Sequence, residues 1–91
     1  MNDVEAIKII IMNAFYEYKS PSEYDIKDFD LIKKVDYSDS IEKITLLINS
    51  KEFEIIKNIL IQDKFYLNLK NKDYLPIQLE FIEKIKNSST E

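Results

Sequence analysis

The ionisable side chains of this 91-residue sequence are carboxylates, lysines and tyrosines, because it contains no histidine, cysteine or arginine. Two carboxylates can hydrolyse a glycoside, and carboxylates that hold Mg²⁺ can act beside a lysine in phosphodiester cleavage. Asp25-Ile26-Lys27 has the acid-x-Lys spacing of some nucleases. Such a tripeptide arises readily by chance in a chain of which 33% is charged, so we assign it no catalytic role.

Other kinds of site need residues that this chain lacks. Without histidine and cysteine the usual nucleophile–base pairs cannot form, and carboxylates alone seldom make a structural zinc site. Without glycine there is no phosphate-cradling loop, and Asp25 to Asp36 lacks the glycine and the ligand spacing of an EF-hand. We therefore predict a protein that is not an enzyme and has no cofactor or metal.

The net charge of −4 is concentrated in one region. Residues 17–42 hold eight acidic residues and four lysines, whereas residues 1–16 sum to −1 and residues 43–91 to +1. A field of one sign steers an oppositely charged partner, and interleaved tyrosines are typical interface anchors. A solvated helix surface would show the same pattern, but we predict a docking surface for a basic or nucleic-acid-binding protein. Its predicted residues are Glu23, Tyr24, Asp25, Asp28, Asp30, Asp36, Tyr37 and Asp39.

Helical periodicity dominates the first half of the chain. Apolar residues recur at i, i+3 and i+4 spacing from Asp3 to Tyr18, which predicts a helix. Ser20-Pro21-Ser22-Glu23 combines a capping serine, a first-turn proline and a glutamate three residues after the cap. This combination predicts that a second helix begins here. The alternation of Tyr24, Ile26 and Asp28 gives the start of a β-strand as an alternative. A short helix ending at Lys34 would instead bury Ile26, Phe29 and Ile32 on one face.

The middle of the chain predicts one or two further helices. Ser40 can cap a helix that begins at Ile41, and Ser50 can cap another, unless the two fuse into one long helix. The predicted buried residues are Ile44, Leu47, Ile48, Phe53, Ile56, Ile59 and Leu60.

The last third combines strand and helix signals. Phe65, Leu67 and Leu69 alternate with polar residues, Asn71-Lys72-Asp73 suits a tight turn, and Tyr74-Leu75 can return as a second strand. Pro76 can open a final helix, and residues 87–91 form a polar tail that we expect to fray. The sequence therefore predicts a single domain over residues 1–91, mainly α, with four to five short helices and one small β-hairpin near residues 65–75. The final helix would bury Ile77, Phe81, Ile82 and Ile85.

Two stretches resemble small winged-helix domains of archaeal and phage type. Residues 59–67, ILIQDKFYL, resemble a recognition helix running into the first wing strand, and residues 74–85, YLPIQLEFIEKI, resemble the second wing strand and its following helix. The resemblance implies a winged-helix-like architecture and, as an alternative function, a DNA-binding transcriptional regulator. The nucleic-acid contacts that it implies are Lys51, Lys57 and Asn58 on the recognition helix and Lys70 and Lys72 on the wing.

Composition also bears on location and class. The absence of cysteine favours a reducing compartment, and no apolar run reaches the length of a membrane span, so we expect a cytoplasmic protein with no membrane partner. Small size and an abundance of residues with AT-rich codons suit accessory proteins of phages and mobile elements. We therefore expect a small acidic inhibitor or regulator of a protein partner, for example an anti-CRISPR-like inhibitor of a nucleic-acid-binding effector. The many isoleucines leave a homodimer open as a further alternative.

Overall fold

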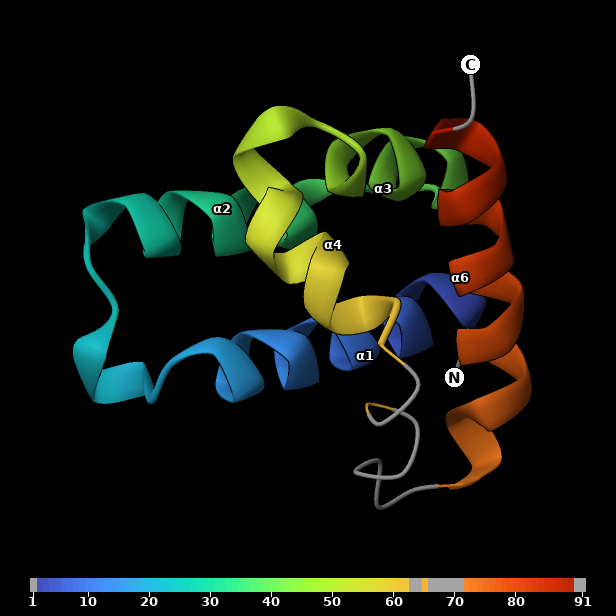
Figure 1. The fold of residues 1–91 in the computed structure, drawn as a ribbon, viewed down its shortest axis with the longest axis horizontal. Coiled ribbons are helices and arrows are strands. Elements are labelled where there is room, and N and C mark those ends of the chain that lie inside the picture. The colour runs from blue at the N-terminus through green and yellow to red at the C-terminus, as the bar shows by residue number, and fades with distance from the viewer. Residues whose placement is uncertain (1, 63–64, 66–71, 90–91) are drawn as a thin grey trace.

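The computed structural model describes residues 2–62, 65 and 72–89. These residues form five α-helices and three 3-10 turns (Figure 1). The mainly helical fold predicted from the sequence is confirmed. In chain order the elements are α1 (Asp3–Tyr18), η1 (Pro21–Glu23), α2 (Ile26–Tyr37), α3 (Ile41–Ile48), η2 (Lys51–Phe53), α4 (Glu54–Leu60), η3 (Lys72–Tyr74) and α6 (Leu75–Ser89).

The first helix is the centre of the packing. α1 contacts each of the other four α-helices, most extensively α4 and then α6. It forms where the sequence predicts it, and Asn2 caps it by accepting a hydrogen bond from the Glu5 amide. α2 returns alongside α1 after the turn at η1, and α4 crosses in front of this pair (Figure 1). α2 lies at the periphery, where it packs mainly against α1 and α3.

One continuous core joins these helices. Three fully buried phenylalanines, Phe15, Phe53 and Phe81, come from α1, η2 and α6. Isoleucines of α1, α3, α4 and α6 fill the space around these rings, so the many isoleucines of the sequence are mostly core residues. The fully buried isoleucines are Ile7, Ile10, Ile11, Ile44, Ile48, Ile56, Ile82 and Ile85.

The middle helices are separate, so a single fused helix is wrong. Ser40 caps α3 as predicted, since its hydroxyl accepts from the Lys43 amide at 3.2 Å. Ser50 does not cap a helix with its side chain, because its hydroxyl donates to the Leu47 carbonyl at 2.6 Å. That bond closes the end of α3 and redirects the chain into η2. Phe53 is buried there, as predicted.

The second helix begins later than predicted. Pro21–Glu23 forms only a short 3-10 turn, in which Ser20 makes no side-chain cap bond. The capping box lies instead between Asp25 and Asp28, each of which accepts a hydrogen bond from the backbone amide of the other. This reciprocal pair starts α2 at Ile26, so neither a strand start nor a helix from Pro21 forms.

The buried face of α2 also differs from the prediction. Ile26 is 81% exposed and Phe29 is 51% exposed, while Asp28, Leu31 and Val35 are buried. Residues 28, 31 and 35 share a face because they stand at i, i+3 and i+7. Ile32 is partly buried against the core, in line with the prediction, but Asp28 and not Ile26 or Phe29 turns toward α1.

The β-hairpin predicted near residues 65–75 is wrong. Phe65 is helical and buried, residues 72–74 form η3, and Leu75 begins α6, so no residue that the structure describes lies in a strand. Pro76 lacks the amide that a first helical turn leaves unpaired, which favours a helix from Leu75 onward. The remaining hairpin positions, including Leu67 and Leu69, lie outside the described residues.

The final helix is longer than predicted. α6 continues to Ser89 and so includes part of the tail that we expected to fray. Its predicted core residues Phe81, Ile82 and Ile85 are buried, and Ile77 is partly buried. Within the described ranges, no helix combines the length and the apolar character needed to cross a bilayer.

Candidate protein-binding surface

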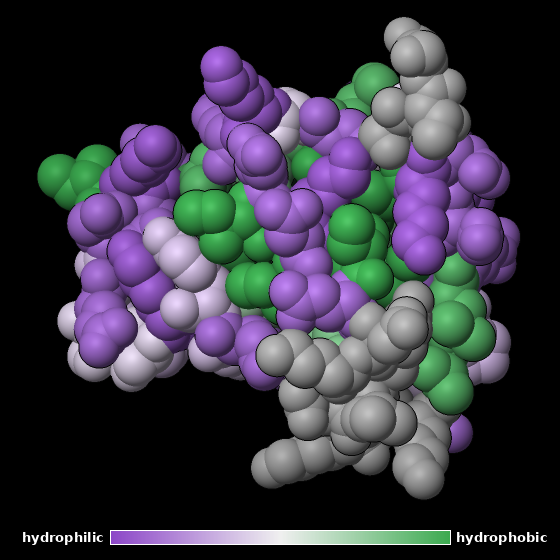
Figure 2. Space-filling view, viewed as in Figure 1, coloured by the Kyte–Doolittle hydropathy of each residue, from purple (hydrophilic) through white to green (hydrophobic). Residues whose placement is uncertain are grey.

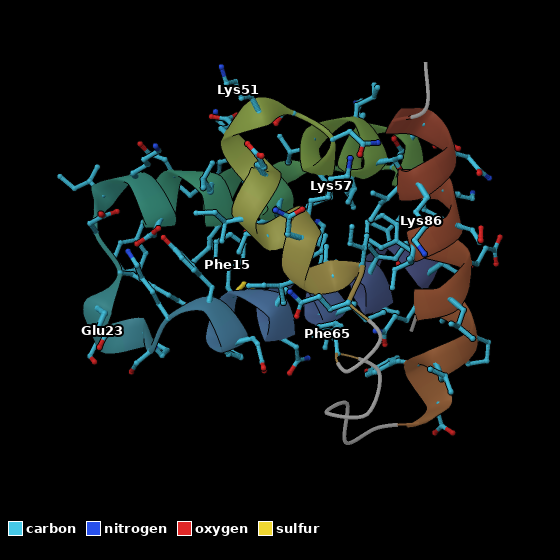
Figure 3. The ribbon with its side chains drawn as sticks, viewed as in Figure 1. Phe15, Glu23, Lys51, Lys57, Phe65 and Lys86 are labelled. Carbon is cyan, nitrogen blue, oxygen red and sulfur yellow. The ribbon has the colours of Figure 1, made fainter. Side chains whose placement is uncertain are left out.

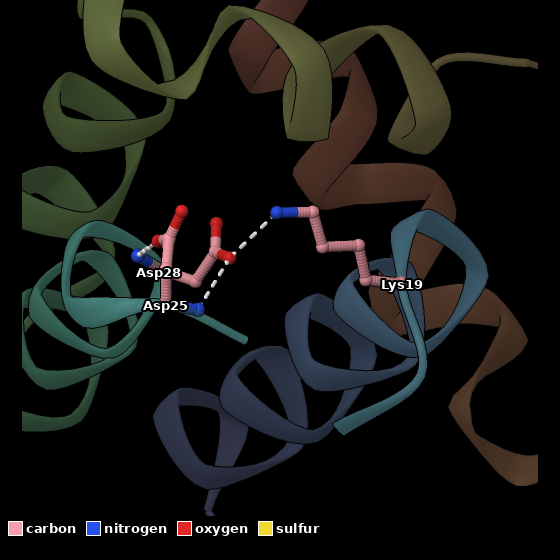
Figure 4. Close-up of polar contacts among 3 residues, drawn as sticks. All are labelled: Lys19, Asp25 and Asp28. Carbon is pink, nitrogen blue, oxygen red and sulfur yellow. Dashed lines mark hydrogen bonds and ion pairs between the residues drawn. The ribbon is translucent and has the colours of Figure 1, made fainter. Parts of the chain in front are cut away.

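Two lysines hold helix α2 against α1, one near each end. Lys19, which caps the C-terminus of α1, places its Nζ 2.8 Å from Asp28 Oδ2 (Figure 4). The same oxygen accepts the Asp25 amide at 3.1 Å. At the other end, Lys8 Nζ donates to the Asp36 carbonyl at 2.6 Å. These contacts decide which side of α2 faces outward.

The ion pair also sets the protonation of Asp28. The hydrogen bond from Lys19 lowers the pKa of Asp28, although burial of the carboxylate opposes this effect. The same bond raises the pKa of Lys19. Asp28 is only 4% exposed, so it supports the surface from beneath and is not available as the direct partner contact that the sequence predicted.

Tyr24 is likewise part of the supporting structure. Its ring packs edge-to-face against Phe15, with centroids 6.3 Å apart, and against Phe29, with centroids 5.7 Å apart. Its hydroxyl is buried with no hydrogen-bond partner, and burial raises the pKa of this phenol. Phe15 points from α1 into the interior (Figure 3). Tyr24 therefore packs between the buried ring of Phe15 and the half-exposed ring of Phe29.

The other predicted acidic residues are accessible. Glu23 points away from the body at η1 (Figure 3), and Asp25, Asp30, Asp36 and Asp39 are also exposed. Asp39 pairs with Lys43 at 2.8 Å, and this hydrogen bond lowers its pKa. Because the Lys19–Asp28 pair is neutral, residues 17–42 keep their charge of −4 without it.

Apolar side chains stand within this acidic region. Ile26, Phe29, Lys33 and Tyr37 follow i, i+3, i+7 and i+11 spacing along the solvent side of α2, and we call them the outer stripe. Tyr37 is 78% exposed. In Figure 2, hydrophobic atoms protrude at the end of the molecule where α2 begins, beside hydrophilic side chains. The sequence predicted Tyr37 as an anchor but assigned Ile26 and Phe29 to the core.

An open groove of 560 Å³ adjoins the outer stripe at Tyr37. It lies between the end of α2 and α3, and Leu46 on its wall is 71% exposed. We did not predict this groove from the sequence. The one local indication of it was Leu46, an apolar residue that lies outside the buried face of α3. The lining residues are Lys34, Tyr37, Ser38, Lys43, Leu46, Leu47, Ser50 and Glu52.

The residues proposed for nucleic-acid binding that the structure describes lie on η2, α4 and η3. Lys51 is exposed in η2 at the upper edge of the view, between Ser50 and Glu52 of the groove lining (Figure 3). On α4, Lys57 is half-buried and Asn58 is exposed. Lys72 belongs to η3, and Lys70 lies outside the described residues. Lys57 and Asn58 are thus neighbours on the short helix α4. Where the resemblance implied a second wing strand, Tyr74 ends η3 and Leu75 begins α6.

The acid-x-Lys tripeptide has a structural explanation. The Asp25 carboxylate accepts the Asp28 amide at 2.9 Å and so caps α2. Within the part of the chain that the structure describes, no group of three or more carboxylates is placed to hold a metal ion.

Comparison with known proteins gives no relative for this chain. No protein-family model matches it, and neither curated proteins nor solved structures show significant similarity to it. The surface of α2 must therefore be interpreted from its own geometry and charge.

Proposed function

We propose that this chain is a non-enzymatic binding protein that docks on a basic protein through α2 and thereby regulates or inhibits it. One observation carries the proposal. α2 buries an aspartate and exposes Ile26, Phe29 and Tyr37 at helical spacing. The Lys19–Asp28 pair and the burial of Leu31 and Val35 fix this rotation of α2, and it leaves three large apolar side chains in solvent. A stripe of large apolar side chains is what helix-mediated recognition uses.

Charge supports the nature of the partner. α2 itself carries three aspartates and three lysines, and the acidic excess of residues 17–42 lies in the segments before and after it, at Glu17, Glu23, Asp25, Asp39 and Glu42. A basic surface would be attracted to this region at long range and oriented by it on contact. Proteins that hold nucleic acids have such basic surfaces. An anti-CRISPR-like inhibitor from a phage or mobile element, acting in the host cytoplasm, is the form that we propose.

The decisive test compares two triple variants of equal charge. Glu23→Lys/Asp30→Lys/Asp36→Lys reverses the α2 region, whereas Glu54→Lys/Glu80→Lys/Glu83→Lys reverses exposed acids on α4 and α6. Each immobilised protein is incubated with nuclease-treated host lysate, and the retained proteins are identified by mass spectrometry. We expect the wild type and the second variant to retain the same basic protein and the first to lose it.

The other outcomes contradict the proposal in different ways. Equal loss by both variants would mean that only net charge matters, and equal retention would place the site elsewhere. Retention that depends on intact nucleic acid would favour the alternative of a DNA-binding regulator. Far-UV circular dichroism of both variants ensures that lost retention is not lost folding.

A further inference from the structure

We infer that this chain forms a symmetric dimer in which the face shared by α3 and α6 packs against the same face of a second copy. At the centre of this face is a hollow of 390 Å³ between α3 and the C-terminal half of α6, two helices that are in direct contact (Figure 1). Among the described residues its lining comes from α3 and α6 alone. The inference therefore goes beyond the proposed function, which uses α2, and does not rest on it.

Leu46 is the apolar projection of this face. Its side chain is 71% exposed, although it belongs to a helix whose Ile44 and Ile48 are fully buried. Leu46 lines both the hollow and the groove on the α2 side, so it stands as a ridge between two depressions. A ridge beside a depression is the self-complementary shape that a symmetric contact needs, because the same patch meets itself. Leu46 of each copy then enters the hollow of the other and loses contact with water.

Two opposite charges on the walls of the hollow specify a second copy as the occupant. Glu42 is exposed on α3, and Lys84 is half-buried on α6. Among the residues that the structure describes, neither side chain forms an ion pair or a hydrogen bond. A two-fold axis along the hollow places α3 of each copy opposite α6 of the other. Glu42 of each copy then meets Lys84 of the other, and complementary charges of this kind fix partner choice and register.

Other polar groups around Leu46 are already bonded within the chain. The Thr45 hydroxyl donates to the Ile41 carbonyl at 2.8 Å, and Lys43 pairs with Asp39 at 2.8 Å. A second copy can therefore cover this part of α3 without leaving these groups unpaired, which would cost free energy.

The excess negative charge of the chain does not oppose this contact. The hollow is lined by one carboxylate and one ammonium, so the charge of its lining is zero. Glu17, Glu23 and Asp25 belong to the end of α1 and the turn before α2. Seven residues line the hollow, fewer than the ~20–30 per side of a standard interface, so we expect a reversible dimer with a Kd of about 10–100 µM.

Sedimentation equilibrium of the full chain, at concentrations that span this Kd, tests the dimer. We expect the wild type to change from monomer to dimer mass, and Leu46→Ser to raise the Kd about tenfold or more because it removes the buried projection. Leu79→Ser is the matched control, at a leucine that is 46% exposed on α6 outside the lining, and should leave the Kd unchanged. A wild type that stays monomeric throughout, or equal effects of the two substitutions, would overturn the inference.

Charge exchange tests the symmetry of the contact. Glu42→Lys and Lys84→Glu should each raise the Kd about tenfold, because each places like charges opposite one another twice. An equimolar mixture of the two variants should dimerise again, since both contacts in the mixed pair join opposite charges. This recovery also shows that both variants are folded. Glu83→Lys, on α6 outside the lining, is the control and should leave the Kd unchanged.

The remaining outcomes decide where the copies meet. If the mixture stays monomeric, Glu42 and Lys84 act within one chain and the inference fails. If Ile26→Ser abolishes the dimer and Leu46→Ser does not, the copies meet through α2 and the inference is overturned. If Leu46→Ser is monomeric yet still captures the basic partner, the dimer and the proposed function are both supported and are independent of one another.

Discussion

Lys19 Nζ lies 2.8 Å from Asp28 Oδ2, so the residue that caps α1 is bonded to the first turn of α2. This contact spans only nine residues of sequence, yet it determines the rotation of α2 about its own axis. With Asp28 turned inward, Ile26, Phe29 and Tyr37 must face outward. The surface that we propose for binding is thus a consequence of one ion pair beneath it.

Removing the carboxylate should destabilise the fold. Asp28→Ala removes the acceptor of the Lys19 ammonium and of the Asp25 amide, and we expect the free energy of unfolding to fall by about 1–3 kcal/mol. Urea unfolding followed by circular dichroism measures this change. Asp30→Ala, on the exposed side of the same helix, should change it by less than about 0.5 kcal/mol. Equal losses for the two variants would contradict the role of the pair.

The same pair should make stability depend on pH at the acidic end. The pKa of Asp28 is lowered in the folded chain, so its contribution is full above its ordinary pKa of 3.8 and is lost as the pH falls through the lower folded value. The pKa of Lys19 is raised, so its contribution is full below 10.5 and is lost only at still higher pH. No histidine titrates between these limits.

Urea midpoints of wild type and Asp28→Asn test this dependence. The difference between the two proteins should be constant from pH 5 to pH 8 and should shrink as the pH falls below about 4. Because asparagine does not titrate, the variant removes the contribution of this carboxyl and leaves those of the other acids. A difference that stays constant down to pH 2 would mean that the pKa of Asp28 is the same in the folded and unfolded chains.

Tyr24→Phe should raise stability or leave it unchanged. The substitution keeps the ring contacts with Phe15 and Phe29 and removes a buried hydroxyl that has no hydrogen-bond partner. Because an unpaired buried hydroxyl costs free energy, we expect a gain of up to about 1 kcal/mol in the free energy of unfolding. Partner capture should persist, since Tyr24 lies beneath the surface. A loss of stability would show that the hydroxyl has a bonding partner in solution.

Ile26→Ser should separate binding from folding. Ile26 is 81% exposed, so we expect the free energy of unfolding to change by less than about 0.5 kcal/mol. Capture of the partner should weaken because an anchor of the outer stripe is lost. Ile55→Ser, at an isoleucine that is 55% exposed on α4, is the matched control and should leave capture intact. If both variants capture the partner as well as the wild type does, Ile26 is not an anchor.

Local sequence signals predicted the helices whose determinants lie within one or two turns. The bounds of α1 follow from its apolar period, and Ser40 caps α3 through the amide three residues on. The β-hairpin failed at residues 72–75 because alternation over a few residues is a weaker signal than Pro76 in a first helical turn. Charge counting also located the acidic region of the candidate site.

The sequence by itself determined the mainly helical class, the extent of α1 and the concentration of negative charge in residues 17–42. Only the tertiary structure decided which side of α2 is buried, which acidic residues reach solvent and that Tyr37 and Leu46 share a groove. The physical reason is that helix period and charge are properties of a segment, whereas burial depends on what lies opposite. Lys19 lies opposite Asp28, and no pattern within α2 reveals that partner.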